Sequence, residues 1–200
     1  PCVLPLHLPH GRVVLRLGFR SHVSVFPSTL PSRPTPLPFP TPPASRARPP
    51  FLPLTSLDAV WFQVAGTLCN LRCNHCFISC APDNHTLGLM SFAQFKPHLD
   101  ESVRLGVKEY YFTGGEPFIN PEIFEILEAA LAVGPVTVLT NATRFDEAKI
   151  ASLVRLRDAS EYTLELRVSI DGFSSETNDL IRGPGTFARA MDGVRLLVAA

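Results

Sequence analysis

The chain has 200 residues, of which 46% are hydrophobic and 18% are charged, and its formal net charge is zero. This length and composition allow one α/β domain with a buried core and exclude a wholly disordered chain. Because 18 basic side chains balance 18 acidic ones, the composition predicts no nucleic-acid partner and no attraction to an anionic membrane. Runs of about 18 consecutive apolar residues are absent, so the sequence predicts no membrane-spanning helix of the usual length and a soluble chain.

Residues 1–57 differ in composition from the rest of the chain. They hold 14 of the 20 prolines, six arginines and three histidines, but no acidic residue. Since proline lacks the backbone donor that regular pairing needs, this segment is expected to be extended or disordered, without a fold of its own. Three interpretations stay open: a linker, upstream sequence that is not native to the protein, or a transit peptide, which the proline density disfavours.

From residue 58 onwards, predicted strands alternate with predicted helices. Short runs of β-branched and aromatic residues predict the strands, and apolar residues that recur at helical spacing predict the helices. The strands are expected at residues 58–65, 109–113, 135–140 and 162–170, and the helices at residues 91–106, 120–134, 146–157 and 186–200.

Local signals mark the ends of these helices. Ser91 and Gln94 have the spacing of a capping box, and Asn120 and Thr186 are predicted caps of the second and fourth helices. Pro97 is expected to kink the first helix or to delay its start, because proline cannot donate a helical hydrogen bond.

Strict alternation with short loops predicts parallel strands, arranged as a barrel or as a doubly wound sheet. In both architectures reactive groups gather at the carboxyl ends of the strands. Four polar segments stand at those ends and are expected to face one rim: Cys69–Cys76, Gly114–Pro117, Thr140–Asn141 and Ser169–Gly172.

Cys69, Cys73 and Cys76 follow the first predicted strand with the spacing C-x3-C-x2-C. Three thiolates within one short loop suit a soft metal. The spacing favours an iron–sulfur cluster over structural zinc, because three cysteines can hold a cubane cluster with one iron open to another ligand. Five cysteines with three in one loop, and no secretory signal, match a disulfide framework poorly.

Cys80 leaves a zinc alternative open, because it extends the loop to a possible four-thiolate site. Otherwise Cys80 packs as a small apolar residue under the loop, and Phe77 is expected to pack there too. His75 lies between two of the candidate ligands. Its side chain is either solvated or hydrogen bonded, or its flat ring lies beside the ligand that occupies the open iron.

The three-cysteine loop, the Gly114-Gly-Glu-Pro117 segment and the Ser169-x-Asp171-Gly ending together resemble the radical S-adenosylmethionine (radical SAM) enzymes. The resemblance covers residues 58–200. It implies an α/β fold, a partial (βα)6 TIM-like barrel with four βα units, preceded by the proline-rich segment of residues 1–57.

The resemblance also implies cofactors and a reaction. A 4Fe–4S cluster would be held by Cys69, Cys73 and Cys76, and S-adenosylmethionine would bind the fourth iron. Reductive cleavage of S-adenosylmethionine would give a 5'-deoxyadenosyl radical that abstracts a substrate hydrogen. No further side chain is assigned a catalytic role.

Further residues are implied as contacts of S-adenosylmethionine. In the Gly114–Pro117 segment, Gly114 and Gly115 would let the backbone approach the methionyl group, Glu116 would face its ammonium, and Pro117 would fix the backbone after the turn. The remaining contacts implied by position are Asn141, Ser169, Asp171, Arg182 as a loop arginine on the carboxylate, and His75 beside the adenine.

Cores of this family generally have six βα units, so the chain is expected to be a fragment whose fourth strand leaves an open edge. The loop most resembles the branch that modifies peptides or proteins or builds cofactors from peptides. Expected partners are a peptide or small-molecule substrate and a reductant such as a flavodoxin or ferredoxin, in a reducing cytoplasm. Two alternatives remain: a non-catalytic zinc-binding module that uses Cys69, Cys73, Cys76 and Cys80, and an inactive gene fragment.

Overall fold

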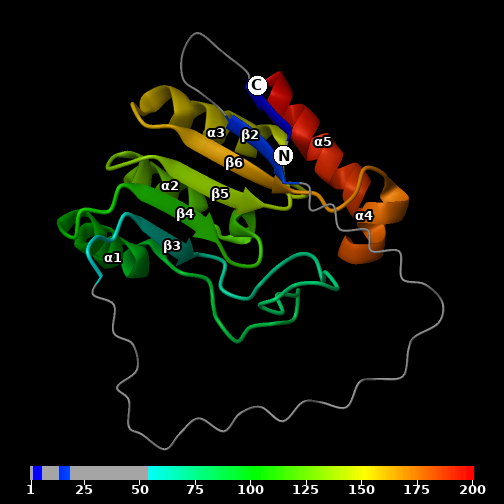
Figure 1. Ribbon diagram of the computed structural model, residues 1–200, viewed down its shortest axis with the longest axis horizontal. Coiled ribbons are helices and arrows are strands. Elements are labelled where there is room, and N and C mark those ends of the chain that lie inside the picture. The colour runs from blue at the N-terminus through cyan, green and yellow to red at the C-terminus, as the bar shows by residue number, and fades with distance from the viewer. Residues whose placement is uncertain (1, 6–13, 19–53) are drawn as a thin grey trace, which may run out of the picture. The chain divides into compact units, whose positions relative to one another are not determined.

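The computed structural model describes residues 2–5, 14–18 and 54–200, and Figure 1 shows how they are arranged. The strands form one sheet in the order β1-β2-β6-β5-β4-β3. Strands β2 to β6 run parallel to their neighbours, whereas β1 pairs antiparallel with β2. The strands are β1 Cys2–Pro5, β2 Val14–Gly18, β3 Ala59–Gln63, β4 Glu109–Thr113, β5 Val136–Thr140 and β6 Leu164–Ser169.

Helices connect the four strands from β3 to β6 and continue after the last of them. Helices α1, α2, α3 and α5 pack side by side in that order along one face of the sheet (Figure 1). The predicted α/β alternation with four parallel strands is therefore confirmed. The helices are α1 Phe92–Arg104, the short 3-10 helix η1 Pro117–Ile119, α2 Ile123–Leu131, α3 Glu147–Ala159, α4 Ser175–Arg182 and α5 Thr186–Ala199.

The predicted helix ends are only partly right. Ser91 and Gln94 form the predicted capping box of α1, and α1 continues through Pro97, which does not delay its start. Asn120 does not cap α2, which begins three residues later. Its buried side chain instead donates to the carbonyl oxygens of Val64 (2.9 Å) and Met90 (2.8 Å), so it ties β3 to the start of α1. Thr186 is the first residue of α5, and its cap is Gly185.

Helix α4, strands β1 and β2 and the short helix η1 were not predicted. Helix α4 buries only Asn178, so its sequence lacks the apolar periodicity that would reveal it. Strands β1 and β2 lie in the segment for which the sequence predicted no regular structure, and the structure differs from that prediction there. Residues 14–18 contain no proline, so their backbone amides can pair with β6. Strand β6 was expected to leave an open edge, but β2 pairs with it on that side.

The core lies between the sheet and the helices. Alternate residues of the strands point to the helices, as the two-residue period of a strand requires. The ring of Phe62 on β3 lies 4.7 Å from that of Phe95 on α1 and 5.7 Å from that of Phe112 on β4, measured between centroids. Burying each such side chain contributes roughly 1.5–3 kcal/mol. This packing holds the carboxyl ends of the strands at one edge of the sheet.

The opposite face of the sheet is more polar. Trp61 on β3 stacks on Tyr111 on β4 with ring centroids 4.5 Å apart, and the guanidinium of Arg167 on β6 lies 5.4 Å from the Tyr111 ring. A depression of about 310 Å³ lies beside Tyr111 and Arg167 at the amino ends of the strands.

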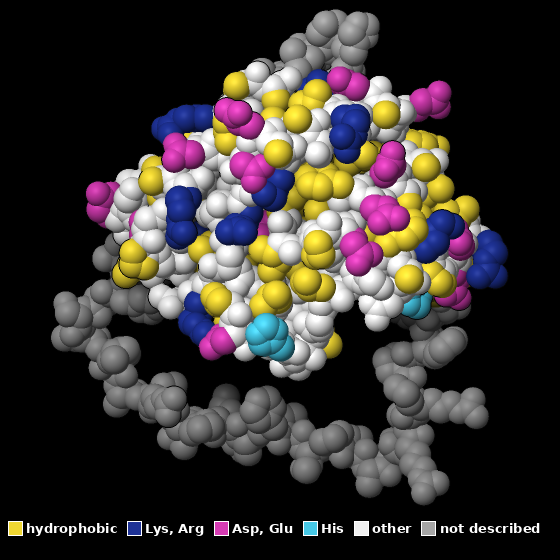
Figure 2. All heavy atoms as spheres, turned by 180° about the vertical axis from the view of Figure 1, so that it is seen from behind, with side chains coloured by type: hydrophobic (Ala, Val, Ile, Leu, Met, Phe, Trp, Pro, Cys, Tyr) yellow, Lys and Arg dark blue, Asp and Glu magenta, His cyan; other side chains and the backbone are white. Residues whose placement is uncertain are grey.

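The outer face of the helices carries both signs of charge. Figure 2 shows Lys and Arg side chains interspersed with Asp and Glu over this face, as the zero net charge suggests. Among the described residues, none of the helices is both long and apolar enough to cross a bilayer.

Candidate functional site

The four predicted polar segments do meet at one edge of the sheet. Each follows the carboxyl end of one of the parallel strands β3, β4, β5 and β6. The interactions described below join the first segment to the third and the fourth, and they join Leu68, which directly precedes the first segment, to the second. The shared rim expected from the sequence is therefore present, and the cysteine loop is its centre.

The Gly-Gly turn after β4 packs directly against the base of the cysteine loop. A Cβ atom on Gly115 would lie 1.9 Å from the carbonyl oxygen of Leu68, and the Glu116 N–H donates to that same oxygen at 3.2 Å. Gly114 has a φ of 129°, a conformation that favours glycine, and its own Cβ would lie 2.8 Å from the Ala65 nitrogen. The space that these glycines leave open is thus occupied by the chain's own backbone.

Glu116 is fully buried and joins three neighbouring elements. Its carboxylate accepts hydrogen bonds from the Phe118 N–H (3.2 Å), the Thr140 hydroxyl (2.7 Å) and the Asn141 N–H (2.8 Å). Burial raises the pKa of this carboxyl, and the three hydrogen bonds oppose that effect. Glu116 therefore ties the end of β4 to the end of β5, while Pro117 begins η1.

The cysteine loop carries free thiols. Cys69 and Cys80 are buried, Cys73 and Cys76 are half-buried, and all four are free, so the disulfide alternative does not describe this loop. Cys80 packs with Cys69 and Leu71, as expected for an apolar residue under the loop. Phe77 does not pack there, because 94% of its surface is exposed.

Burial raises the pKa of three thiols of the loop, those of Cys69, Cys73 and Cys80. Burial raises the pKa of Cys69 to about 11 and that of Cys80 to about 12. Burial also raises the pKa of Cys73, although the positive charge of Arg182 acts in the opposite direction. Metal binding requires thiolates, so a bound cation would have to displace these protons.

The cysteine side chains of the loop are of the chemical type that binds an iron–sulfur cluster. Three soft, free thiols stand on one loop, and the side-chain amide of Asn141 donates to the sulfur of Cys69. Within the described part of the chain, no three Cys, His, Asp or Glu side chains converge on one point as ligands of a single metal ion. A cubane cluster does not require such convergence, since each thiolate binds a different iron.

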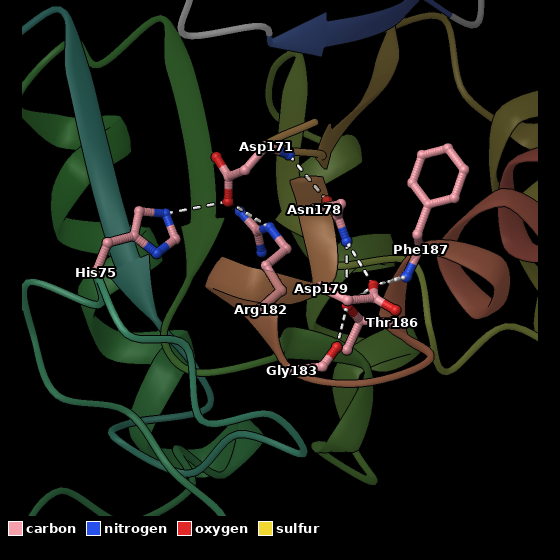
Figure 3. Close-up of polar contacts among 8 residues, drawn as sticks. All are labelled: His75, Asp171, Asn178, Asp179, Arg182, Gly183, Thr186 and Phe187. Atoms are coloured by element: carbon pink, nitrogen blue, oxygen red, sulfur yellow. Dashed lines mark hydrogen bonds and ion pairs between the residues drawn. The ribbon is translucent and has the colours of Figure 1, made fainter. Parts of the chain in front are cut away.

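The cysteine loop is docked on the end of β6 and on α4 (Figure 3). His75 Nε2 lies 3.2 Å from Asp171 Oδ2, and Arg182 Nε lies 2.6 Å from the same oxygen. Next to His75, the backbone N–H of Asn74 donates to the Ile181 carbonyl at 2.8 Å, and its side chain donates to the Leu180 carbonyl at 2.9 Å. Three predicted site residues, His75, Asp171 and Arg182, are thus brought together.

The placement of Arg182 differs in detail from the expectation. Arg182 is the last residue of α4 rather than part of a loop. Its Nε and Asp171 Oδ2 are buried and form an ion pair without the geometry of a hydrogen bond. Ser169, the last residue of β6, is half-buried at the same rim.

Asn141 follows β5 and contacts the first residues of the cysteine loop. Its Nδ2 lies 3.0 Å from Asn70 Oδ1 and 3.8 Å from the Cys69 sulfur. Asn70 in turn donates to the Thr143 hydroxyl at 2.8 Å. Neither Asn70 nor Thr143 was predicted as a site residue, and the one sequence signal for them is that each lies within two residues of a predicted one.

Asp179 holds the turn between α4 and α5 (Figure 3). Its carboxylate accepts hydrogen bonds from the Gly185 N–H (2.7 Å), the Thr186 hydroxyl (2.8 Å) and the Phe187 N–H (2.8 Å). Although burial raises the pKa of this carboxyl, its hydrogen bonds lower the pKa to about 2 overall. Sequence reasoning missed Asp179 because it missed α4.

Replacing Asp179 with alanine is expected to speed amide hydrogen exchange at Gly185 and Phe187, which lose their acceptor. In the wild type, the carboxylate's contribution is complete above its ordinary pKa of 3.8 and is lost as the pH falls towards 2. Exchange at these amides, corrected for its intrinsic rate, should accelerate in that window. The matched control is Asp192→Ala, since Asp192 on α5 is exposed and pairs with Arg195. Equal exchange in both variants would contradict this role.

Known proteins match this chain in sequence and in fold. The model of the Radical SAM superfamily matches residues 64–200. The mycofactocin maturase MftC of Mycobacterium ulcerans (strain Agy99) is 34% identical over 134 residues, which cover 66% of this chain and 34% of that protein. The AdoMet-dependent heme synthase of Methanosarcina barkeri (strain Fusaro / DSM 804) is 34% identical over 139 residues, which cover 68% of this chain and 38% of that protein.

A solved structure shares the fold. Streptococcus suis SuiB bound to S-adenosylmethionine superposes with a TM-score of 0.58 at 21% identity, over 71% of this chain and 31% of SuiB. SuiB has also been solved with its precursor peptide SuiA. The chain spans about a third of the length of the curated relatives named above.

The four parallel strands and their helices correspond to part of the TIM-like barrel of this family. The family match begins in the residues that lead from β3 into the cysteine loop and continues through all four segments of the rim. Since it covers more than half of the sequence, the chain belongs to the radical SAM superfamily.

Proposed function

We propose that Cys69, Cys73 and Cys76 hold a 4Fe–4S cluster and that S-adenosylmethionine binds beside it at the same rim. The observation that carries this proposal is the free, three-thiol loop braced by the Gly115–Glu116 turn at the carboxyl edge of a parallel sheet. When bound and reduced, the cluster supplies the electron that splits the sulfonium of S-adenosylmethionine into methionine and a 5'-deoxyadenosyl radical, which removes a substrate hydrogen.

The chain's residues have separate parts in this proposal. The turn at Gly114–Pro117 supports the cysteine loop and borders the methionyl group. Arg182 offers a positive charge for the methionyl carboxylate, and its pairing with Asp171 keeps that guanidinium at the rim. The Ser169 hydroxyl offers a hydrogen bond to the ribose or to the carboxylate, and Asp171 can accept one from a ribose hydroxyl. His75 lies half-exposed beside them, where its ring can cover the adenine.

For the substrate, we propose a peptide or protein, or a cofactor built from a peptide. The relatives that support this class are the mycofactocin maturase and SuiB, whose structure with a precursor peptide is known. The electron would come from a reductant such as a flavodoxin or ferredoxin. Free thiols and an oxygen-sensitive cluster suit a reducing cytoplasm. Residues 58–200 would form the domain that carries this chemistry.

Release of 5'-deoxyadenosine tests the proposal. The full chain is reconstituted anaerobically with iron and sulfide, mixed with S-adenosylmethionine and reduced with dithionite. The wild type is expected to release 5'-deoxyadenosine, detected by mass spectrometry, and Cys73→Ala is expected to release none. Equal release from both proteins would exclude this function.

A further inference from the structure

Asn141 has its whole side-chain amide engaged within the protein. Its Oδ1 accepts from the Thr143 N–H at 2.9 Å and from the Thr143 hydroxyl at 2.7 Å. Its Nδ2 donates to Asn70 Oδ1 at 3.0 Å and to the Cys69 sulfur at 3.8 Å. The residue is 7% exposed. An amide group has two N–H donors and two acceptor lone pairs, so all four positions are occupied.

The orientation of this amide follows from its partners. The Thr143 backbone N–H can only donate, so the atom that faces it must be the oxygen of Asn141. The nitrogen therefore points to Cys69 and Asn70. The backbone is held as well, because the Asn141 N–H donates to buried Glu116 and the Ala142 N–H donates to the Thr140 hydroxyl at 3.0 Å.

We propose that Asn141 is a positioning residue for Cys69. The side-chain N–H of Asn141 donates to the Cys69 sulfur that would bind the cluster. This inference rests on the proposed function and names a further determinant of that site. A hydrogen bond to a ligand sulfur stabilises the reduced, more negative state of a cluster and so raises its reduction potential. The bond also keeps the first cysteine of the loop at the end of β5.

The proposal differs from a direct contact between Asn141 and S-adenosylmethionine. An amide that serves Cys69, Asn70 and Thr143 has no donor left for another ligand. Loss of this side chain should therefore change the potential of the cluster and leave the binding of S-adenosylmethionine unchanged.

The test compares Asn141→Leu with the wild type in the reconstituted full chain. Leucine has nearly the shape of asparagine but no donor. Midpoint potentials are measured by a redox titration followed by EPR without S-adenosylmethionine, and equilibrium dialysis gives the Kd for S-adenosylmethionine. The matched control is Thr143→Val, which removes one of the bonds to Oδ1 and the acceptor of the Asn70 amide but leaves Nδ2 on the sulfur. Asn141→Ser is the second variant, because its short polar side chain cannot reach Cys69.

The Asn141 variants are expected to shift the midpoint potential to more negative values, by more than Thr143→Val does, at unchanged Kd for S-adenosylmethionine. If the potential is unchanged, or if only the binding of S-adenosylmethionine weakens, the inference is wrong and the proposed function stands. A wild-type chain that takes up neither iron nor sulfide would overturn both.

Discussion

Replacing Gly115 with alanine is expected to destabilise the chain by about 3 kcal/mol, the upper end of the usual cost of overpacking. The added Cβ would lie 1.9 Å from the Leu68 carbonyl oxygen and 2.7 Å from the Cys69 nitrogen. Both are backbone atoms, so the contact cannot be relieved by rotating a flexible side chain. The chain would have to move the turn away from the cysteine loop.

Urea unfolding measures this effect, and Gly88→Ala is the matched control. A Cβ on Gly88 would meet nothing within 4 Å, so that substitution should change the free energy of unfolding by no more than about 0.5 kcal/mol. Gly115→Ala should also lower the iron content after reconstitution, because its clash falls on the backbone of Cys69. Equal unfolding midpoints for the two variants would show that the turn does not brace the loop.

Replacing Glu116 with alanine is expected to cost about 3 kcal/mol or more of unfolding free energy. Three donors, the Phe118 N–H, the Thr140 hydroxyl and the Asn141 N–H, lose their acceptor in a fully buried place. Each unsatisfied buried donor costs about 1–3 kcal/mol, and water entering the cavity offsets part of the sum. Glu128→Ala is the control, since Glu128 is exposed on α2 and should change stability by less than about 0.5 kcal/mol.

The effect of Glu116→Ala should depend on pH. Burial raises the pKa of Glu116 above its ordinary 4.5, so the folded chain binds this proton more tightly than the unfolded chain. The resulting stabilisation is fully present below pH 4.5 and is lost as the pH rises through the folded pKa. The difference in unfolding free energy between wild type and variant should therefore be largest at low pH. A difference that grows with rising pH would contradict the burial of this carboxyl.

Much of the fold was predictable because its signals are local. Strand β4 occupies the predicted residues 109–113, and α1 has the predicted capping box at Ser91. Helix α4 was not predictable in this way, since its residues bury almost no apolar surface and its turn is held by one carboxylate, Asp179. Asn120 has the sequence of a cap, but tertiary contacts with β3 and α1 use its side chain instead.

The candidate site likewise has features that the sequence predicts and features that depend on tertiary contacts. The spacing of the cysteines and the positions of the four segments after parallel strands predicted a common rim, because both depend on chain order alone. The burial of Glu116 depends on where β5 places Thr140 and Asn141, which no local pattern reports. The exposure of Phe77 likewise depends on the path of the loop, which no local pattern reports.

The proposed cluster is tested by the metal content of the reconstituted chain and of four single variants: Cys69→Ala, Cys73→Ala, Cys76→Ala and Cys80→Ala. Iron, zinc and acid-labile sulfide are measured together with the EPR spectrum of the reduced protein. The wild type and Cys80→Ala are expected to contain the iron and sulfide of one 4Fe–4S cluster, and the other three variants are expected to lose the cluster. Zinc without sulfide in the wild type, or a loss in Cys80→Ala as large as in the others, would contradict the proposed cluster and support a four-thiolate metal site.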